Sequence, residues 1–391
     1  MMDFSTVDPD EQSAQVWRKF TGLLRDVVGD VEDWPVHARD RWPAQLHKAL
    51  GAEGFIVPRW PAAEGGLNAS PLVERLISEE EQRRQVYISK TPAMLAATVR
   101  KYGSDEIRDG VVRGVAAGEI RICLGYTEPD GGSDIAAVRT RAVRDGDYWI
   151  INGTKVFTSV ANVSQYVFLL TNTDPDGQRH RNLTMFLVPL DAPGVSIEPM
   201  ITFGGERTNI TSYNEVRLHD KYRLGEVNQG WRVLSDPLNT EHGITKSDDA
   251  HLEEAHGQGT LSTTPWSVLL ARALRWASRP GATGAKPFDE PVVAAGIAEV
   301  AVDLEIARNS LGPLGKVAGS EGIIRSAARM LELIGADAIV IDHDAAIEDA
   351  AFAAMYTKAP PMAIAGGSVE VFRNMLATTQ LNLPRALPQG G

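Results

Sequence analysis

The sequence predicts an α+β protein with an N-terminal helical domain, a middle antiparallel β domain and a C-terminal helical bundle. Two observations support this fold class. Apolar residues recur at helical spacing in the first and last thirds of the chain, whereas the middle third consists of short alternating runs separated by turn pairs. We therefore expect three domains at residues 1–120, 121–228 and 229–391. With 43% hydrophobic residues, the 391-residue chain can bury cores of this size.

Helical spacing in the first domain is clearest at Phe20, Leu24 and Val27, with charged residues filling the gaps. The segment WPAAEGG and the Thr91–Pro92 step interrupt this pattern without adding strand signals. Five or six helices are expected.

Hairpin signals dominate the middle domain. The pair Asp145–Gly146 separates RTRAV from YWII, and Asn152–Gly153 separates YWII from TKVFTS. The runs YVFLL and LTMFLVPL are separated by the polar segment DPDGQ. We expect a compact antiparallel β domain that closes into a barrel or a sandwich.

The last domain contains two long apolar segments, VVAAGIAEVAVDLEIARNSL and IIRSAARMLELIGADAIVI. Their length and lack of a single polar face indicate buried helices of a four-helix-type bundle. The stretch from Thr245 to Thr264 is rich in acidic, glycine and threonine residues, and we expect it to be an exposed excursion.

Composition excludes several classes of function. A formal net charge of −12 argues against nucleic acid or anionic lipid as the main partner, because phosphate binding needs a basic surface. No apolar stretch reaches the roughly 20 residues that cross a bilayer, and the acidic N-terminus is unlike a signal peptide. We expect no membrane span and a cytoplasmic location.

Neither a disulfide nor a metal site is expected. Cys123 is the only cysteine, and a thiol nucleophile there lacks supporting residues. His251 and His256 are five residues apart, so they do not lie on one helical face, and His242 is more distant still. No G-x-G-x-x-G segment follows an expected strand, which disfavours a nicotinamide-dependent Rossmann enzyme.

The segment LGYTEPDGGSD, residues 124–134, is suited to a flavin. A reduced flavin needs hydrogen-bond donors at its N5 and O4 edge, and a glycine-rich turn lets backbone N–H groups approach a pyrophosphate. Thr127 and Ser133 can supply such contacts. The segment resembles the TEP-x-x-GSD signature of acyl-CoA dehydrogenases, which implies FAD as cofactor and Tyr126, Thr127, Gly132 and Ser133 as its ligands. By itself, a glycine-rich turn is more often a plain loop.

A second segment, INGTKVFTSVAN at 151–162, resembles the strand that flanks the flavin in this family. Phe157 stands where many members have tryptophan, and Ser159 where many have threonine; taken alone, both residues fit a strand core and edge equally well. RLGEVNQGW at 223–231 and the terminal AGGSVEVFRN extend the resemblance over nearly the whole chain. It is greatest to actinobacterial members, including those acting on steroid side chains.

The resemblance implies that a carboxylate removes the α-proton of an acyl thioester while the β-hydrogen leaves as hydride to flavin N5, and that the thioester oxygen is hydrogen-bonded. Gly366 stands where the family often has its catalytic glutamate and cannot act as a base. Its N–H is a candidate donor to the thioester oxygen, or else it is a simple turn glycine. Glu241 matches a minority position after the β domain and is the candidate base, with a solvated charge as the alternative.

Two family segments are absent, the Arg-x-x-Phe-Gly and Gln-x-x-Gly-Gly segments that hold the adenosine half of FAD across a subunit interface. The main hypothesis is an FAD-dependent α,β-dehydrogenase of an acyl-CoA or acyl-carrier thioester. It would pass electrons to an electron-transfer protein and form a homo- or hetero-oligomer, a dimer or a tetramer. The alternatives are a non-catalytic or half-site partner subunit, and a flavin oxidase or monooxygenase on the same fold.

Overall fold

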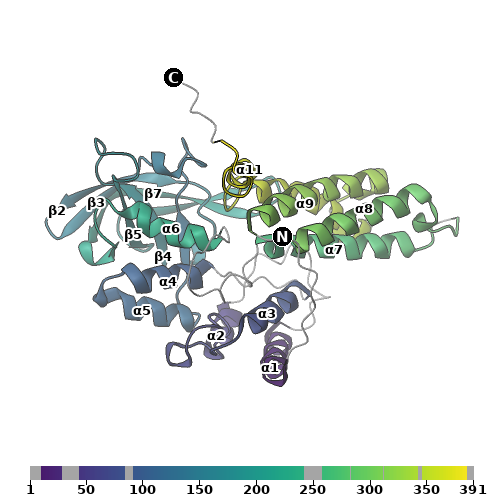
Figure 1. The fold of residues 1–391 in the computed structure, drawn as a ribbon, viewed down its shortest axis with the longest axis horizontal. Helices are drawn as coiled ribbons and strands as arrows, with labels where there is room; N and C mark the ends of the chain where they lie inside the picture. The colour runs from purple at the N-terminus through teal and green to yellow at the C-terminus, as the bar shows by residue number, and fades with distance from the viewer. Residues whose placement is uncertain are drawn as a thin grey trace.

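The chain folds in the expected order of helices, sheet and helices. A computed structural model describes residues 10–28, 44–83, 91–241, 258–281, 283–310, 312–341 and 346–384. Figure 1 shows the β-sheet with the last two N-terminal α-helices beside it at one end of the molecule, the first three N-terminal α-helices below the middle of the view, and a long bundle of C-terminal helices at the other end. The predicted α+β fold class is confirmed.

Five α-helices precede the sheet within the described residues, in agreement with the five or six expected. They are α1 (Glu11–Val28), α2 (Ala44–Ala52), α3 (Pro71–Arg83), α4 (Thr91–Tyr102) and α5 (Asp105–Ala116). In α5 the acidic residues Asp105 and Glu106 occupy the first turn, where their negative charges interact favourably with the positive end of the helix dipole.

The middle third forms one sheet whose strands run in the order β6-β7-β3-β2-β4-β5-β8, with β1 paired to β4. Most pairs are antiparallel, as expected, but β4 pairs in parallel with both β1 and β2. The strands are β1 (Ile122–Gly125), β2 (Arg141–Asp145), β3 (Tyr148–Lys155), β4 (Tyr166–Asn172), β5 (Leu183–Pro189), β6 (Val195–Ile201), β7 (Arg207–His219) and β8 (Arg223–Leu224).

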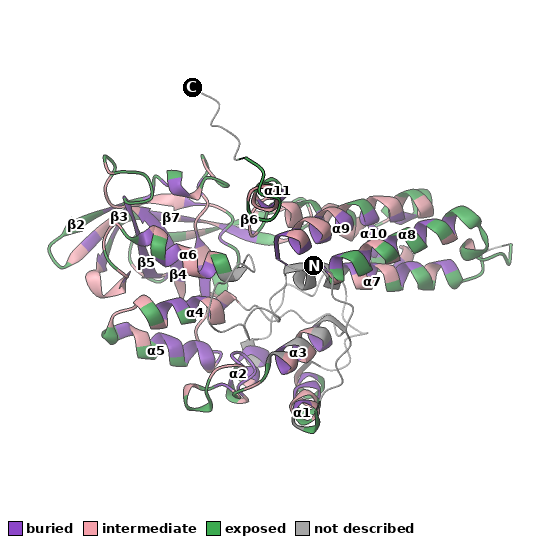
Figure 2. Cartoon of the chain, viewed as in Figure 1, coloured by how far each residue is buried: buried purple, intermediate pink, exposed green. Residues whose placement is uncertain are grey.

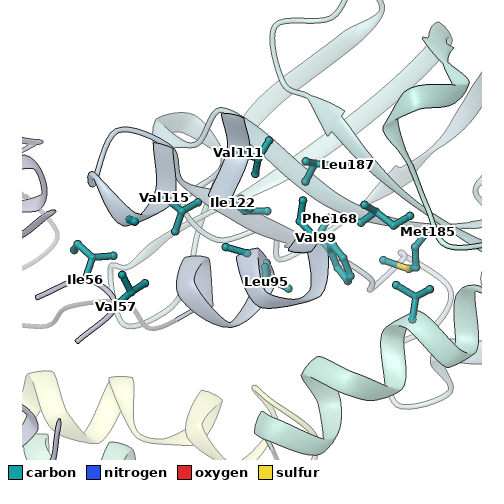
Figure 3. Packing of buried hydrophobic residues seen from close by; sticks show 14 of the residues in the cluster. Ile56, Val57, Leu95, Val99, Val111, Val115, Ile122, Phe168, Met185 and Leu187 are labelled. Carbon is teal, nitrogen blue, oxygen red and sulfur yellow. The ribbon is translucent and has the colours of Figure 1, made fainter. Parts of the chain in front are cut away.

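Each face of this sheet covers a different core. Phe168 and Met185 on one face pack with the helical residues Leu95 and Val99 (Figure 3). On the other face the ring of Trp149 in β3 meets the ring of Phe186 in β5, with centroids 5.3 Å apart, although these strands are not neighbours in the sheet. The sheet therefore folds over itself like a sandwich. The described strand path ends at β6 and β8 without joining them, so a closed barrel is not formed there.

One expected turn is a bulge instead. The pair Asn152–Gly153 lies inside β3, where the register with β7 shifts between Ile151 and Gly153. The Asn152 amide bonds with Glu215 of β7, and a Cβ on Gly153 would lie 2.5 Å from Thr140 Oγ1. The hairpin prediction is wrong here because close strand packing also requires glycine. The other expected connection, at Asp145–Gly146, does join β2 to β3.

After the sheet, α6 (Gly230–Glu241) packs against α4 and β5 through Val233 and Leu234. The bundle that follows surrounds a separate core containing Trp266, Ile323 and Phe352. Its helices are α7 (Gln258–Ser278), α8 (Pro291–Arg308), α9 (Gly312–Ile334), α10 (Ala351–Lys358) and α11 (Val369–Met375). Figure 2 shows buried residues on the inward faces of α7, α8 and α9.

The excursion expected from Thr245 to Thr264 differs in part. Residues 258–264 belong to α7, and residues 245–257 lie outside the described part of the chain. No helix in the described ranges is long and apolar enough to span a membrane.

Candidate functional site

The two flavin-type segments, 124–134 and 151–162, lie side by side. The N–H of Val156 donates a hydrogen bond to the carbonyl oxygen of Thr127 at 2.9 Å. The ammonium group of Lys155 donates to the carbonyl oxygen of Tyr126 at 3.1 Å. The loop after β1 and the end of β3 thus form a single support, which we call the cradle: Tyr126–Ser133 and Lys155–Ser159.

A buried ion pair holds the cradle together. Lys155 Nζ lies 2.8 Å from Glu128 Oε1, with the lysine side chain fully buried and the glutamate side chain only 9% exposed. Glu128 also accepts the backbone N–H groups of Arg139 and Thr140, both at 2.7 Å. A buried charge pair with its remaining lone pairs satisfied fixes the geometry of the segments that it joins.

Burial and charge act against each other in this pair. Burial alone would raise the pKa of Glu128, but the Lys155 charge and the three N–H donors outweigh it and hold this pKa below its usual range. Burial lowers the pKa of Lys155 to about 8, although Glu128 opposes that shift. The sequence reasoning did not single out either residue. The sequence features that could have indicated this pair are a lysine on a strand otherwise patterned for burial and a glutamate inside the glycine-rich motif.

The end of β3 presents an aromatic ring to solvent. Phe157 is 61% exposed and has a φ of +56°, a conformation that non-glycine residues rarely adopt. The next residue, Thr158, is buried and exchanges hydrogen bonds with Asn209 through both its N–H and its carbonyl group. Ser159 is exposed, and its hydroxyl pairs with Thr208 Oγ1 at 3.2 Å. A large exposed ring on a strained, firmly anchored backbone is typical of a binding site.

The glycine turn of the cradle leaves open space around its backbone. Neither Gly131 nor Gly132 has a positive φ, and a Cβ on Gly131 would meet nothing within 4 Å. A Cβ on Gly132 would make only an ordinary contact of 3.7 Å with Thr127. Neither backbone conformation nor packing among the described residues therefore requires glycine at these positions. A bound group that approaches the backbone closely would require it, and in this respect the turn fits a pyrophosphate or a flavin edge.

The remaining predicted cradle residues occupy its rim. Gly132 and Ser133 are exposed, while Tyr126 and Thr127 are half-buried. The Tyr126 ring packs edge-on against Phe168, with centroids 6.1 Å apart. The structure thus brings together the two segments that carry the six residues that the sequence proposed for flavin binding.

Gly366 lies in a turn between α10 and α11. It has a φ of +69° and is followed by Gly367 at +98°, values that glycine adopts without strain. Ser368 then caps α11 by accepting the N–H of Val371 at 3.4 Å. The end of α10 also meets the β domain, where Lys358 pairs with Glu206 at 3.8 Å. This contact joins the end of α10, eight residues before Gly366, to the domain that carries the cradle.

The remaining candidates from the sequence are the proposed base, three histidines and the single cysteine. Glu241 is the last residue of α6, and its side chain lies outside the described residues, as do His242, His251 and His256. Among the residues that the structure describes, no cluster of His, Cys, Asp and Glu side chains could hold a metal ion. Burial raises the pKa of the Cys123 thiol to about 12, so it is not a reactive nucleophile.

Comparisons with known proteins agree with this architecture. The models of the acyl-CoA dehydrogenase N-terminal, middle and C-terminal domains match residues 11–119, 123–219 and 264–381. The chain is 30% identical over 358 residues to acyl-CoA dehydrogenase FadE29 of Mycobacterium tuberculosis, covering 86% of this chain and 88% of that protein.

Two solved structures have the same fold. The ChsE4-ChsE5 complex from Mycobacterium tuberculosis has a TM-score of 0.82 and 25% identity, covering 98% of this chain and 100% of that one. The Tcur3481-Tcur3483 steroid ACAD has a TM-score of 0.80 and 26% identity, with the same coverage of 98% and 100%. The three domain matches together span almost all of the described residues. The chain belongs to the acyl-CoA dehydrogenase family of oxidoreductases.

Proposed function

We propose that this protein catalyses the FAD-dependent α,β-dehydrogenation of an acyl-CoA thioester. The observation that carries this proposal is the cradle, where the hydrogen bond between Val156 and Thr127 joins the strand end that carries the exposed Phe157 ring to the loop that carries the glycine-rich turn. The ring suits contact with the flat face of a flavin. The hydroxyl groups of Thr127, Ser133 and Ser159 are donors of the kind that the N5 and O4 edge needs.

Bound FAD would supply the acceptor for the β-hydrogen, which leaves as hydride. Two tasks then fall to side chains and backbone groups of the protein. Glu241 takes the α-proton as general base, and the N–H of Gly366 donates a hydrogen bond to the thioester oxygen. Negative charge develops on that oxygen as the α-proton leaves, so a fixed donor there lowers the barrier.

The substrate and the assembly are also proposals. We infer a bulky acyl group of the steroid-side-chain class, because a solved relative with 26% identity is described as a steroid ACAD. Electrons would pass to an electron-transfer protein. Oligomerisation is supported by the outer face of α8, where Val292, Val302 and Ile306 are 60%, 59% and 39% exposed. Exposed apolar stripes of this kind usually mark contact surfaces.

A second candidate is a half-site subunit that completes its FAD site with a different chain. Arg275 and Arg279 lie where the family's Arg-x-x-Phe-Gly segment would be, and both pair with the buried carboxylate of Glu348, at 2.8 and 3.0 Å. Both guanidinium groups are therefore already engaged by a carboxylate of the same chain, which leaves fewer of their N–H donors for a pyrophosphate. The solved relatives ChsE4-ChsE5 and Tcur3481-Tcur3483 each carry the names of two different chains, which supports an assembly of two chain types.

The experiment is a Glu241→Gln substitution in the flavin-loaded full-length protein. Glutamine keeps the size but cannot accept the proton. We expect acyl-CoA to bind while anaerobic flavin bleaching slows by about 10²–10⁴-fold, the usual contribution of general-base catalysis. Rapid mixing with absorbance detection measures the rate.

Glu226→Gln is the matched control, because Glu226 precedes α6 and its side chain is 77% exposed. It should bleach at the wild-type rate. A Glu241→Gln protein with undiminished bleaching would remove Glu241 from the mechanism and point to a base on another subunit, as the half-site candidate requires. Rapid reoxidation by oxygen would instead favour the oxidase or monooxygenase alternative.

A further inference from the structure

Two polar side chains of α9 bind the backbone of the turn that precedes Gly366. Lys316 and Ser320, one helical turn apart, are only 5% and 0% exposed. Lys316 Nζ donates to the carbonyl oxygens of Met362 and Ala365, at 2.8 and 2.6 Å. The Ser320 hydroxyl donates to the same Met362 oxygen at 2.8 Å.

The bond to Ala365 fixes the direction of the next N–H group. The carbonyl of Ala365 and the N–H of Gly366 belong to one peptide unit, and the structure contains no cis peptide bond among its described residues. In a trans peptide these two groups point in opposite directions. Because Lys316 holds the carbonyl toward α9, the N–H of Gly366 must point away from α9.

This N–H is available to a ligand. The N–H groups of Ile364 and Ala365 both donate to the carbonyl oxygen of Pro361, whereas the N–H of Gly366 donates to no backbone carbonyl among the described residues. The nearby residue Ile364 is 70% exposed, so this turn lies at the surface of the protein. A buried cation on the carbonyl side also polarises the peptide and strengthens its N–H as a donor.

We propose that Lys316 is a positioning residue for the thioester: it orients and polarises the Ala365–Gly366 peptide so that the Gly366 N–H binds the carbonyl oxygen of the substrate. This inference rests on the proposed function, in which Gly366 is the thioester donor. Lys316 itself does not touch the substrate. The Ser320 hydroxyl donates to Met362 of the same turn rather than to Ala365, and Ser320 therefore serves as a matched control.

The test uses para-dimethylaminocinnamoyl-CoA, a thioester whose absorption band moves to longer wavelength when its carbonyl oxygen accepts hydrogen bonds. With the flavin-loaded full-length wild type, the bound probe should show this shift. Lys316→Met should bind the probe but lose most of the shift, and bleach its flavin about 10²-fold more slowly, the effect expected of a misplaced contact. Lys316→Arg, which keeps the donor and the charge, should restore most of the shift.

Ser320→Ala should leave the shift close to wild type, because the Ala365 carbonyl is still held. An equal loss in Ser320→Ala and Lys316→Met would mean general loosening of the turn and would overturn the inference. A full shift in Lys316→Met would overturn it while leaving Gly366 as the donor. No shift in the wild type would refute the proposed thioester site and the role of Lys316 together. If Lys316→Met does not fold, Lys316→Gln, with a shorter side chain, replaces it with the same outcomes.

Discussion

The Glu128–Lys155 pair shows how one contact determines the shape of the candidate site. The two residues are 27 positions apart in the sequence, and their charges meet only because the loop after β1 lies against the end of β3. In sequence, a lone lysine on a strand indicates an exposed edge. The motifs therefore identified the residues on the surface of the cradle, whereas the ion pair beneath them depends on tertiary packing that a single sequence does not specify.

Removing the cation should be costly. Lys155→Met leaves the Glu128 carboxylate buried without its charged partner, and we expect the free energy of unfolding to fall by roughly 3–5 kcal/mol. The double variant Lys155→Met with Glu128→Gln should recover part of the loss, because no unpaired charge remains. Urea unfolding followed by circular dichroism measures both.

The exposed pair between Arg139 and Asp130, 2.9 Å apart with side chains 77% and 70% exposed, is the control. Arg139→Met should cost less than about 1 kcal/mol, as is usual for a surface ion pair. Equal costs for the buried and exposed pairs would mean that the Glu128–Lys155 pair does not hold the cradle together.

At the level of helices and strands, the sequence predicted which elements form but not how closely they approach. The Asn152–Gly153 pair has the composition of a hairpin turn, yet β3 continues through it because β7 pairs on both sides of the bulge. Similarly, the spacing of α9 indicates a buried helix but not its partner. Gly322 of α9 faces the indole of Trp266 in α7, and a Cβ there would lie 2.3 Å from the Trp266 ring.

Two glycine-to-alanine substitutions test this packing. Gly322→Ala would overpack a fully buried tryptophan, and we expect it to lower the free energy of unfolding by roughly 1–3 kcal/mol. Gly110 lies in the middle of α5, and a Cβ added there would have nothing within 4 Å. Gly110→Ala should therefore raise the free energy of unfolding by roughly 0.5–1 kcal/mol. Thermal unfolding of both variants gives the signs, and the same sign for both would contradict the close approach of α7 and α9.

For the whole molecule, the order of periodicities was sufficient to predict helices, sheet and helices. It also predicted that the β domain would close as a barrel or a sandwich, but not that β4 would pair in parallel with both β1 and β2. Nor did it indicate that the turn carrying Gly366 would be held by α9. Both features bring together segments distant in sequence, which a single sequence does not specify.

We propose that the cradle holds FAD and that the protein uses this FAD to oxidise an acyl-CoA. The most direct measurement is the absorption spectrum of the purified full-length protein before and after anaerobic addition of a steroid-side-chain acyl-CoA. We predict a flavin spectrum, release of FAD on denaturation and bleaching by the thioester. Protein that stays colourless when expressed alone and together with a second acyl-CoA dehydrogenase subunit would contradict the claim.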